Sequence, residues 1–434
     1  YRYGQNLVMG NGLVFNPGER ILGSTAPGHM LLSAIGYAIV GEDALPSLMS
    51  ILGCVAWTAQ AIAAYVLFLP ALGKLRAVVL SFALALGAAR SFMWVPFETN
   101  IVAAFALWAF VAVAHRRFVS AAVLAGLAAL MRPDALLLTA VLGAFTLKEL
   151  RLRAWKPALA FLLVFLPWVI FAWRYYGSPL PQSAVTKFHR TGVAEYGAHI
   201  LRLVGETAWP FSRGVLWLSA AWLAIVAGTV ALARRDRMLA LYAAYLVLHA
   251  VAYMYLRPFI GHDWHLYPLQ LGATCFLLAG LARATKVASQ PAARRGAAVL
   301  LSLIGLCVVA RTSVMAATYR DAYWTGARHA VYRRLAVLIA GAAKPGDAFA
   351  SVEVGTLAYY THLRVYDMGG LVTDTAKVSG DPAVRWLVLD SNYMWMAPPW
   401  KPVFGGKQER FKAYVFHIPA GKTLTFPRVE TLPP

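Results

Sequence analysis

Long apolar segments separated by short polar turns constrain the fold of this chain more than any other feature. A helix of roughly 20 mostly apolar residues crosses a lipid bilayer, and slightly shorter segments are accommodated by local thinning or by flanking side chains that reach the interface. The pattern therefore predicts a polytopic α-helical membrane protein with about ten transmembrane helices. We expect them at 46–70, 77–93, 99–114, 118–131, 134–147, 157–173, 214–232, 238–256, 266–282 and 296–315.

The composition agrees with a lipid environment. Apolar residues make up 60% of the 434 positions and charged residues only 14%, a balance that soluble globular proteins do not have. The formal net charge is +21, but the lysines and arginines lie in short runs between apolar segments and form no single basic face, so nucleic acid is not an expected partner. Cys54, Cys275 and Cys307 lie inside apolar segments, where a thiol behaves as a small hydrophobic group.

The positions of lysine and arginine predict the orientation in the membrane. In the short loops, fifteen of these residues lie in one alternating set and three in the other, and the richer set is expected in the cytoplasm. Residues 1–45 and the loop 174–213 then lie outside. The apolar stretch 29–40 is too short to cross, so we expect a helix in the outer interface within an external loop 1–45, followed by a transmembrane domain at 46–315.

The tail from 316 to 434 has a different character. Its apolar runs shorten to strand length after an expected amphipathic helix at about 321–342 and the turn Lys344-Pro345-Gly346-Asp347. We expect strands at 348–354, 384–390 and 411–417. The tail is therefore predicted to be a small extracytoplasmic α/β domain.

Two polar groups near the expected outer ends of helices have both a structural and a functional interpretation. The segment from Asn6 to Pro27 is rich in glycine and proline and carries Glu19 and Arg20 at a turn, which is typical of an ordered connector. Glu98 begins a helix, where a carboxylate favours the helix dipole. It could equally stand at the mouth of an external cavity, and the sequence leaves both interpretations open.

Arginine, lysine and histidine residues supply the cationic candidates on the same side. Arg132-Pro133-Asp134 has ordinary helix-start chemistry with an internal ion pair, and Arg132 would also suit a phosphate oxygen. The segment 176–183 with Lys187 fits a surface loop attracted to acidic lipid or a site for an anionic headgroup.

The segment His262-Asp263-Trp264-His265 invites a metal site, but its spacing matches no specific zinc signature. Histidines that donate to a phosphate fit its location better than a metal site does. The sequence contains no Walker loop, no dinucleotide glycine fingerprint and no nucleophile elbow, so a soluble nucleotide site is not indicated.

These pieces, in this order, resemble the polytopic GT-C glycosyltransferases that use polyprenyl-phosphate sugars, especially the bacterial arabinofuranosyltransferase-like and mannosyltransferase-like members. The resemblance covers most of the chain, and its first stretch is the most specific. The residues that carry it are Tyr1 to Leu7, Gly12 to Arg20, Thr25-Ala26-Pro27, Phe97-Glu98-Thr99, Arg132-Pro133-Asp134, Tyr176 to Pro181 with Lys187, Glu353-Val354-Gly355, Tyr359-Tyr360 and Val365 to Leu371. The chain departs from its relatives at Ala26 to His29.

The resemblance implies transfer of a sugar from a polyprenyl-phosphate donor to an envelope glycan, lipid or protein acceptor, at the outer face of a bacterial inner (plasma) membrane. In that family an acidic residue before the opening loop supplies the catalytic carboxylate, which places it upstream of Tyr1. No cofactor is implied with certainty, and a divalent metal ion is left open, with no metal ligand assigned. The candidate site residues are Glu19 and Glu98 as the visible candidates for a catalytic carboxylate, Lys187, Arg132, His262 and His265 at the donor phosphate, and Asn6, Arg20 and Asp263 at sugar or acceptor.

Two other classes of function remain. A transporter or flippase would show paired hydrophobic halves and helices broken at the membrane midplane, and the sequence shows neither an internal repeat nor midplane charges. A membrane scaffold whose tail recruits partners is the third class, although elaborate polar loops at several helix ends favour an enzyme.

Overall fold

The computed structural model divides the chain into two compact units, which we describe separately. It describes residues 1–87, 97–188, 191–208, 214–258, 260, 263–287, 327–373, 381–408, 411–419 and 422–423, with scattered positions between 291 and 310. We call Ser47–Val169 with Phe188–Ala316 the helical unit. The head unit consists of Tyr1–Pro46, Ile170–Lys187 and Ala317–Pro434.

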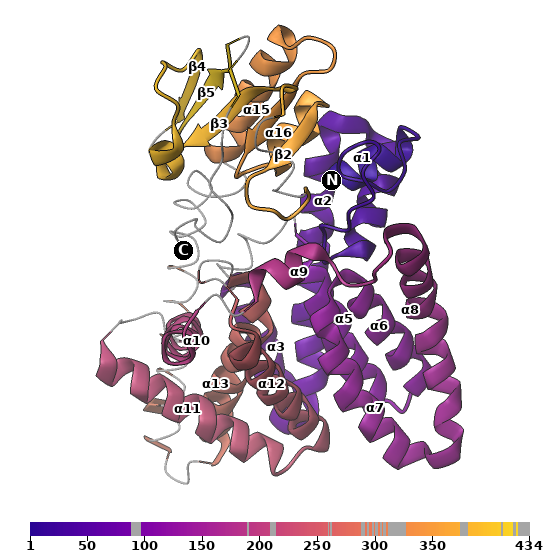
Figure 1. Ribbon diagram of the computed structural model, residues 1–434. Helices are drawn as coiled ribbons and strands as arrows, with labels where there is room; N and C mark the ends of the chain where they lie inside the picture. Colours follow the sequence, from indigo (N-terminus) through magenta and orange to yellow (C-terminus); the bar gives the residue numbers. More distant parts are fainter. Residues whose placement is uncertain are drawn as a thin grey trace. The chain divides into compact units, whose positions relative to one another are not determined.

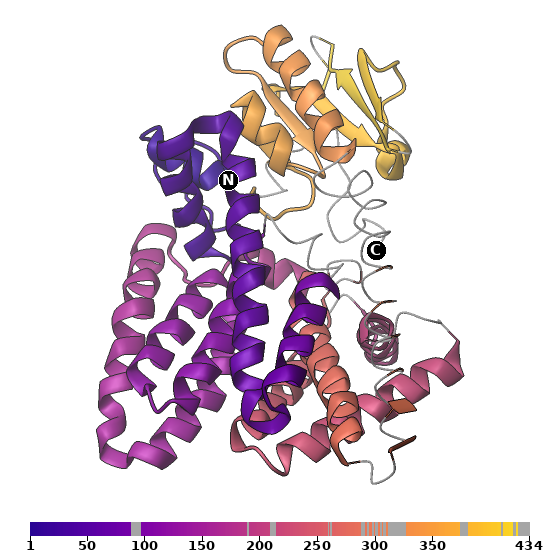
Figure 2. The same cartoon turned by 180° about the vertical axis from the view of Figure 1, so that it is seen from behind.

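Apolar helices build the helical unit (Figures 1 and 2). Two helices, α2 (Pro27–Leu72) and α8 (Trp155–Tyr176), have residues in both units. The others are α3 (Lys74–Gly87), α5 (Thr99–Ala114), α6 (Phe118–Met131), α7 (Leu136–Leu150), α10 (Val193–Ala208), α11 (Val215–Ala233), α12 (Arg237–Leu256) and α13 (Tyr267–Val287), with short 3-10 turns η1 (Pro133–Ala135), η2 (Arg151–Ala154) and η3 (Asp263–Leu266).

Five helical segments of the described residues are long and apolar enough to cross a membrane, and two more apolar helices are shorter. The five are Pro27–Leu72, Pro133–Tyr176, Val215–Ala233, Arg237–Leu256 and Asp263–Ala284, and the shorter two are Thr99–Ala114 and Phe118–Met131. These segments confirm a helical, membrane-embedded protein. The number of about ten spans stays a prediction, because most of the expected span 296–315 and the end of the expected span 77–93 lie outside the described residues.

The expected interfacial helix at 29–40 is the first part of the longer helix α2. The backbone leaves helical geometry at Gly41, where φ is 74° and ψ is −173°, and helical structure resumes directly after it. Glycine tolerates this conformation because it has no Cβ. The kink therefore separates the helix that contains residues 29–40 from a second helix that begins at the polar residues Glu42 and Asp43 and continues to Leu72. The interfacial position of the first helix stays a prediction.

Close helix packing and outward-facing apolar side chains are both typical of a membrane bundle. A Cβ atom on Gly228 of α11 would lie 2.5 Å from the carbonyl oxygen of Phe276, and one on Gly280 of α13 would lie 2.7 Å from Gly228 Cα. Small residues of this kind let two helix backbones approach each other in lipid. Leu163 on α8 and Leu216 on α11 are largely exposed, as expected for side chains that face lipid.

The head unit contains a five-stranded sheet of order β2-β1-β3-β5-β4. Strands β2 (Arg364–Asp367), β1 (Ala348–Ser351) and β3 (Val384–Asp390) run parallel, and β5 (Phe411–His417) pairs antiparallel with β3 and with β4 (Phe404–Gln408). Two helices, α15 (Ala327–Ala342) and α16 (Gly355–Thr361), complete the small α/β domain, together with the turn η5 (Ser391–Met396). The first part of the expected helix 321–342 lies outside the described residues.

The N-terminal segment belongs to the same unit, because buried side chains bind it to the sheet domain. It comprises α1 (Arg2–Val8) and the loop that follows, and Gln182–Lys187 forms α9. Arg2 Nη2 donates to the carbonyl oxygen of His362 (3.1 Å), and Asn16 Nδ2 donates to that of Val365 (2.8 Å) while Asn16 Oδ1 accepts from Val365 N (3.0 Å). Burial lowers the pKa of Arg2 to about 10, which leaves it charged at neutral pH.

Candidate functional site

The helical unit contains a buried cluster of charged side chains at Arg132. The Arg132 guanidinium donates to Glu98 Oε1 at 3.1 Å and to both oxygens of Asp134, with its shortest contact, from Nη2, at 2.8 Å. Tyr253 Oη donates to Asp134 Oδ2 at 2.6 Å and lies 3.3 Å from Arg132 Nη2. We call Glu98, Arg132, Asp134 and Tyr253 the carboxylate cluster.

The local sequence explains how the carboxylate cluster assembles. Helix α6 ends at Met131, and Arg132 adopts an extended conformation (φ −156°, ψ 133°). Pro133 then begins η1, where its fixed φ suits a helix start, so Arg132 and Asp134 meet across a single turn. Glu98 precedes α5 but makes no capping hydrogen bond with its side chain. Its carboxylate instead binds Arg132, so the dipole-capping interpretation does not describe its main contact.

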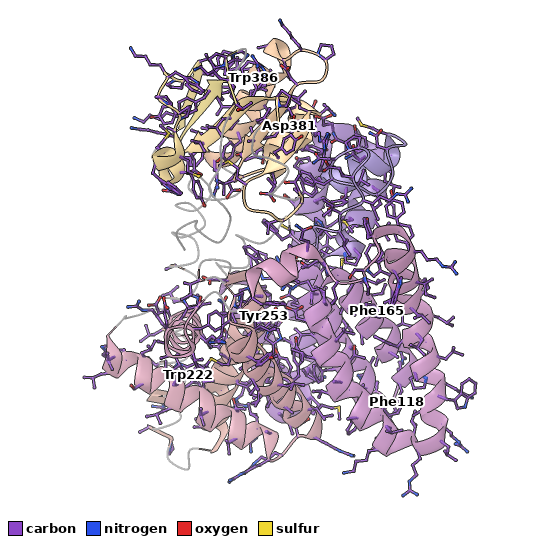
Figure 3. The ribbon with its side chains drawn as sticks, in the orientation of Figure 1. Phe118, Phe165, Trp222, Tyr253, Asp381 and Trp386 are labelled. Atoms are coloured by element: carbon purple, nitrogen blue, oxygen red, sulfur yellow. The ribbon has the colours of Figure 1, made fainter. Side chains whose placement is uncertain are left out.

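Tyr253 of the carboxylate cluster is labelled in Figure 3. Three further side chains, those of His265, His249 and Tyr196, extend the cluster within the helical unit. The His265 ring stacks on the Tyr253 ring with centroids 4.6 Å apart, and the His249 ring lies 4.8 Å from the Tyr253 ring. His249 Nε2 donates to the backbone oxygen of His265 at 2.8 Å. Tyr196 Oη lies 2.7 Å from His265 Nε2, which connects α10 to η3.

A second pair of side chains, His199 and Asp263, also connects α10 to η3. His199 Nε2 lies 2.8 Å from Asp263 Oδ1. The side chains of His199 and Asp263 are 17% and 25% exposed, whereas that of Arg132 is only 9% exposed. The His199–Asp263 pair is therefore the more open end of a network that continues inward through His265 and Tyr253 to Arg132.

The charge balance of the carboxylate cluster limits what it can bind. One guanidinium between two carboxylates carries a net charge of −1 when all three groups are ionised, and Arg132 directs its donors to Glu98, Asp134 and Tyr253. Desolvation opposes the burial of these charges, and their mutual attraction offsets it, so removing one partner would leave a buried charge without compensation. Arg132 is placed to hold two carboxylates, and an anionic ligand would have to displace them.

The remaining candidate residues lie in two groups. Asp263 and His265 belong to the network just described, while His262 lies outside the described residues. Lys187 is the last residue of α9, and its side chain is outside the described part of the structure.

The N-terminal candidates make contacts within the head unit. Asn6 is buried, and its amide nitrogen donates to the backbone oxygens of Val14 and Phe15. Glu19 accepts from Asn16 and from Arg364. Arg20 is exposed, and its guanidinium lies 4.8 Å above the centre of the Tyr175 ring. Among these three residues, Arg20 is the most exposed.

Sequence reasoning did not single out Tyr196, His199, His249 or Tyr253. His249 and Tyr253 lie in a segment that we expected to span the membrane, and a titratable side chain inside such a segment is itself a signal of function. His199 and Tyr196 lie three residues apart on α10, a spacing that places them on one helix face. Among the described residues, no group of three or more histidine, cysteine, aspartate or glutamate side chains could hold a metal ion.

Comparison with known proteins identifies the fold. No family model and no curated protein sequence matches the chain. The crystal structure of ArnT from Cupriavidus metallidurans bound to undecaprenyl phosphate is similar over 95% of this chain and 92% of ArnT, with a TM-score of 0.60 and 17% sequence identity. The chain has a GT-C fold.

A second group of structures shares the GT-C fold. The Archaeoglobus fulgidus oligosaccharyltransferase in complex with zinc and sulfate is similar over 89% of this chain, with a TM-score of 0.56 and 14% identity. AglB from the same organism, in complex with an inhibitory peptide and a dolichol-phosphate, gives a TM-score of 0.54 and 11% identity. The chain spans 62% and 64% of these two longer proteins, so the likeness to them is one of fold alone.

Proposed function

We propose that this protein is a membrane glycosyltransferase that moves a sugar from a polyprenyl-phosphate donor to an extracytoplasmic acceptor of the cell envelope, whether glycan, lipid or protein. The observation that carries the proposal is the ionisable network of the helical unit, with carboxylates and histidines together in a GT-C fold. The ArnT structure contains undecaprenyl phosphate, which supports a lipid phosphate as the donor's leaving group.

The chemistry requires three kinds of group. An acceptor hydroxyl oxygen forms a bond to the anomeric carbon of the sugar, and the bond from that carbon to the phosphate oxygen breaks, with its electron pair remaining on the phosphate. A carboxylate accepts the proton of the hydroxyl, and cationic donors stabilise the departing phosphate. No nucleotide takes part, in agreement with the absence of nucleotide motifs from the sequence.

The contacts of the carboxylate cluster suggest a division of roles. We assign Glu98 to the acceptor or sugar, because Arg132 holds its carboxylate in place at a helix start. We assign Arg132 and Asp134 to positioning that carboxylate, in place of the phosphate-binding role first considered for Arg132. His265, His262 and Lys187 remain the proposed phosphate ligands, and Arg20 and Asp263 remain proposed near the sugar or acceptor. Asn6 and Glu19 are proposed to be structural, because their partners lie within the head unit.

The charge pattern supports an extracytoplasmic site in a bacterial inner membrane. The carboxylate cluster lies where α6 ends and α5 begins, whereas Arg116 and Arg117 lie between the other ends of these two helices. Arg234 lies between α11 and α12, Arg237 is the first residue of α12, and Tyr253 lies near the opposite end of α12. The richer set of cations thus marks the cytoplasmic ends, and the network belongs to the opposite ends.

The test is sugar transfer in nanodiscs containing the purified full chain, with a panel of radiolabelled polyprenyl-phosphate sugars and extracted envelope acceptors. We expect Glu98→Gln to lower kcat/KM by about tenfold or more, the loss typical of one hydrogen bond to a charged group. The matched control is Glu149→Gln, because Glu149 also pairs with an arginine, Arg237, at 2.6 Å in the same unit but at the opposite helix ends. If the folded wild-type protein transfers no sugar but moves a labelled lipid between leaflets, the protein is a flippase and the proposal is wrong.

A further inference from the structure

The most open part of the network is the pair formed by His199 and Asp263. His199 lies one turn after Tyr196 on α10, and Asp263 lies two residues before His265 on η3. The two contacts, Tyr196 with His265 and His199 with Asp263, therefore connect the same two elements side by side. Of these two contacts, the one between His199 and Asp263 joins two side chains that can carry charge and are partly exposed. Tyr196 and His265 are buried.

The geometry of this pair leaves one imidazole nitrogen for a ligand. Nε2 faces the Asp263 carboxylate at 2.8 Å, and a carboxylate partner fixes that nitrogen as the one bearing a proton. No hydrogen bond from His199 Nδ1 occurs among the described residues. When the ring is protonated, Nδ1 is an N–H donor in a partly exposed position, held in place by Asp263.

An anion suits that donor because of the charge of the protonated His199 ring itself, since the neighbouring groups are acidic. Arg132 is occupied by Glu98 and Asp134, and Asp263 adds a further negative charge. Within the described part of the helical unit, a protonated His199 is the partly exposed group of this network that can offer positive charge to a substrate. A phosphate oxygen would both accept its hydrogen bond and compensate its charge.

We propose that His199 binds a phosphate oxygen of the polyprenyl phosphate through Nδ1, and that Asp263 positions the His199 ring. This inference rests on the proposed function and deepens it, because it names a phosphate ligand that sequence reasoning did not identify. It also gives Asp263 a role through His199, in place of direct contact with sugar or acceptor.

The experiment measures lipid binding without any transfer step. The full chain is reconstituted in phosphatidylcholine nanodiscs, and undecaprenyl phosphate is titrated and bound lipid counted by native mass spectrometry. We expect His199→Gln to weaken binding by about tenfold or more, the loss typical of one hydrogen bond to a charged group. We expect His199→Arg, which keeps the charge and the donors, to recover most of it. His115→Gln is the matched control, because His115 is exposed and follows the other end of α5.

A parallel titration with phosphatidylglycerol separates the lipid monophosphate from a general anionic headgroup. Loss of phosphatidylglycerol binding in His199→Gln, with unchanged binding of undecaprenyl phosphate, would overturn the inference, as would equal binding of undecaprenyl phosphate by all variants. If the wild type transfers sugar while His199→Gln binds normally, this inference fails and the proposed function stands. If binding depends on His199 but no sugar is transferred from any donor, the proposed function fails and the phosphate site stands.

Discussion

Replacing Arg132 by methionine is the sharpest test of how the carboxylate cluster is held. Methionine keeps much of the aliphatic volume of arginine but removes all of its donors. Glu98 and Asp134, whose side chains are 10% and 11% exposed, would then face each other's charge with little water. The lost contacts are one hydrogen bond to Glu98, the fork to Asp134 and the contact with Tyr253.

The magnitude follows from these contacts. At the nitrogen to oxygen distances of 3.1 and 2.8 Å, each attraction amounts to about 5–6 kcal/mol at an effective dielectric constant of about 20, before the desolvation of the charges is subtracted. Removing one partner of a buried ion pair costs about 3–5 kcal/mol in net terms. At roughly 2–4 °C per kcal/mol for a unit of this size, Arg132→Met should lower the Tm by about 6–20 °C.

The assay is a thermal scan of tryptophan fluorescence in detergent at fixed protein concentration and scan rate. A second variant tests whether the loss of stability comes from the uncompensated carboxylates. The triple variant Arg132→Met, Glu98→Gln, Asp134→Asn removes both negative charges and should recover at least about half of the decrease in Tm. A single variant within 1–2 °C of the wild type, or a triple variant less stable than the single one, would refute the assignment of Arg132 as the group that compensates both carboxylates.

Three further outcomes follow from described contacts. Tyr253→Phe should lower stability by about 1–2 kcal/mol, because the hydroxyl hydrogen bond to the buried Asp134 carboxylate is lost; the same thermal scan measures it. Gly228→Val should lower the Tm by several degrees, since a Cβ would clash with the Phe276 carbonyl, whereas Gly143→Val, where a Cβ meets open space, should change it little. Burial raises the pKa of the Glu353 carboxyl group, so this group holds its proton more tightly in the folded head unit than in the unfolded chain. The stability of the folded protein should therefore fall as pH rises above about 4.5. Urea titrations between pH 4 and 7 should show a weaker fall in Glu353→Gln, and an equal slope in both proteins would contradict the assignment.

Parts of the fold could be predicted because local sequence determines them. The strands expected at 384–390 and 411–417 coincide with β3 and β5, since a continuous or alternating apolar run bounded by turn residues is a local signal. Strands β2 and β4 were not expected. They span only four and five residues, and β4 contains Gly405 and Gly406, so they depend on pairing with their neighbours.

The candidate site was predictable only in part for a related reason. Arg132 and Asp134 are two residues apart, and their ion pair could be expected from the turn that joins their helices. Their contacts with Glu98, 34 positions away, and with Tyr253, 119 positions from Asp134, depend on which helices pack together. Hydrophobic periodicity identifies the buried face of a helix but does not identify the helix that packs against it.

The hydrogen bonds between the N-terminal segment and the sheet domain also determine when the head unit can be completed during synthesis. Arg2 and its backbone acceptor at His362 are separated by 360 positions. At about 5–20 residues per second, the ribosome needs roughly 20–70 seconds to make the chain between them. Through that interval Arg2 and Asn16 can be hydrated but cannot form their native bonds. A chain stopped before β2 would carry Arg2 and Asn16 without the backbone partners that they bind in the head unit, so these residues reach their final environment long after they are synthesised.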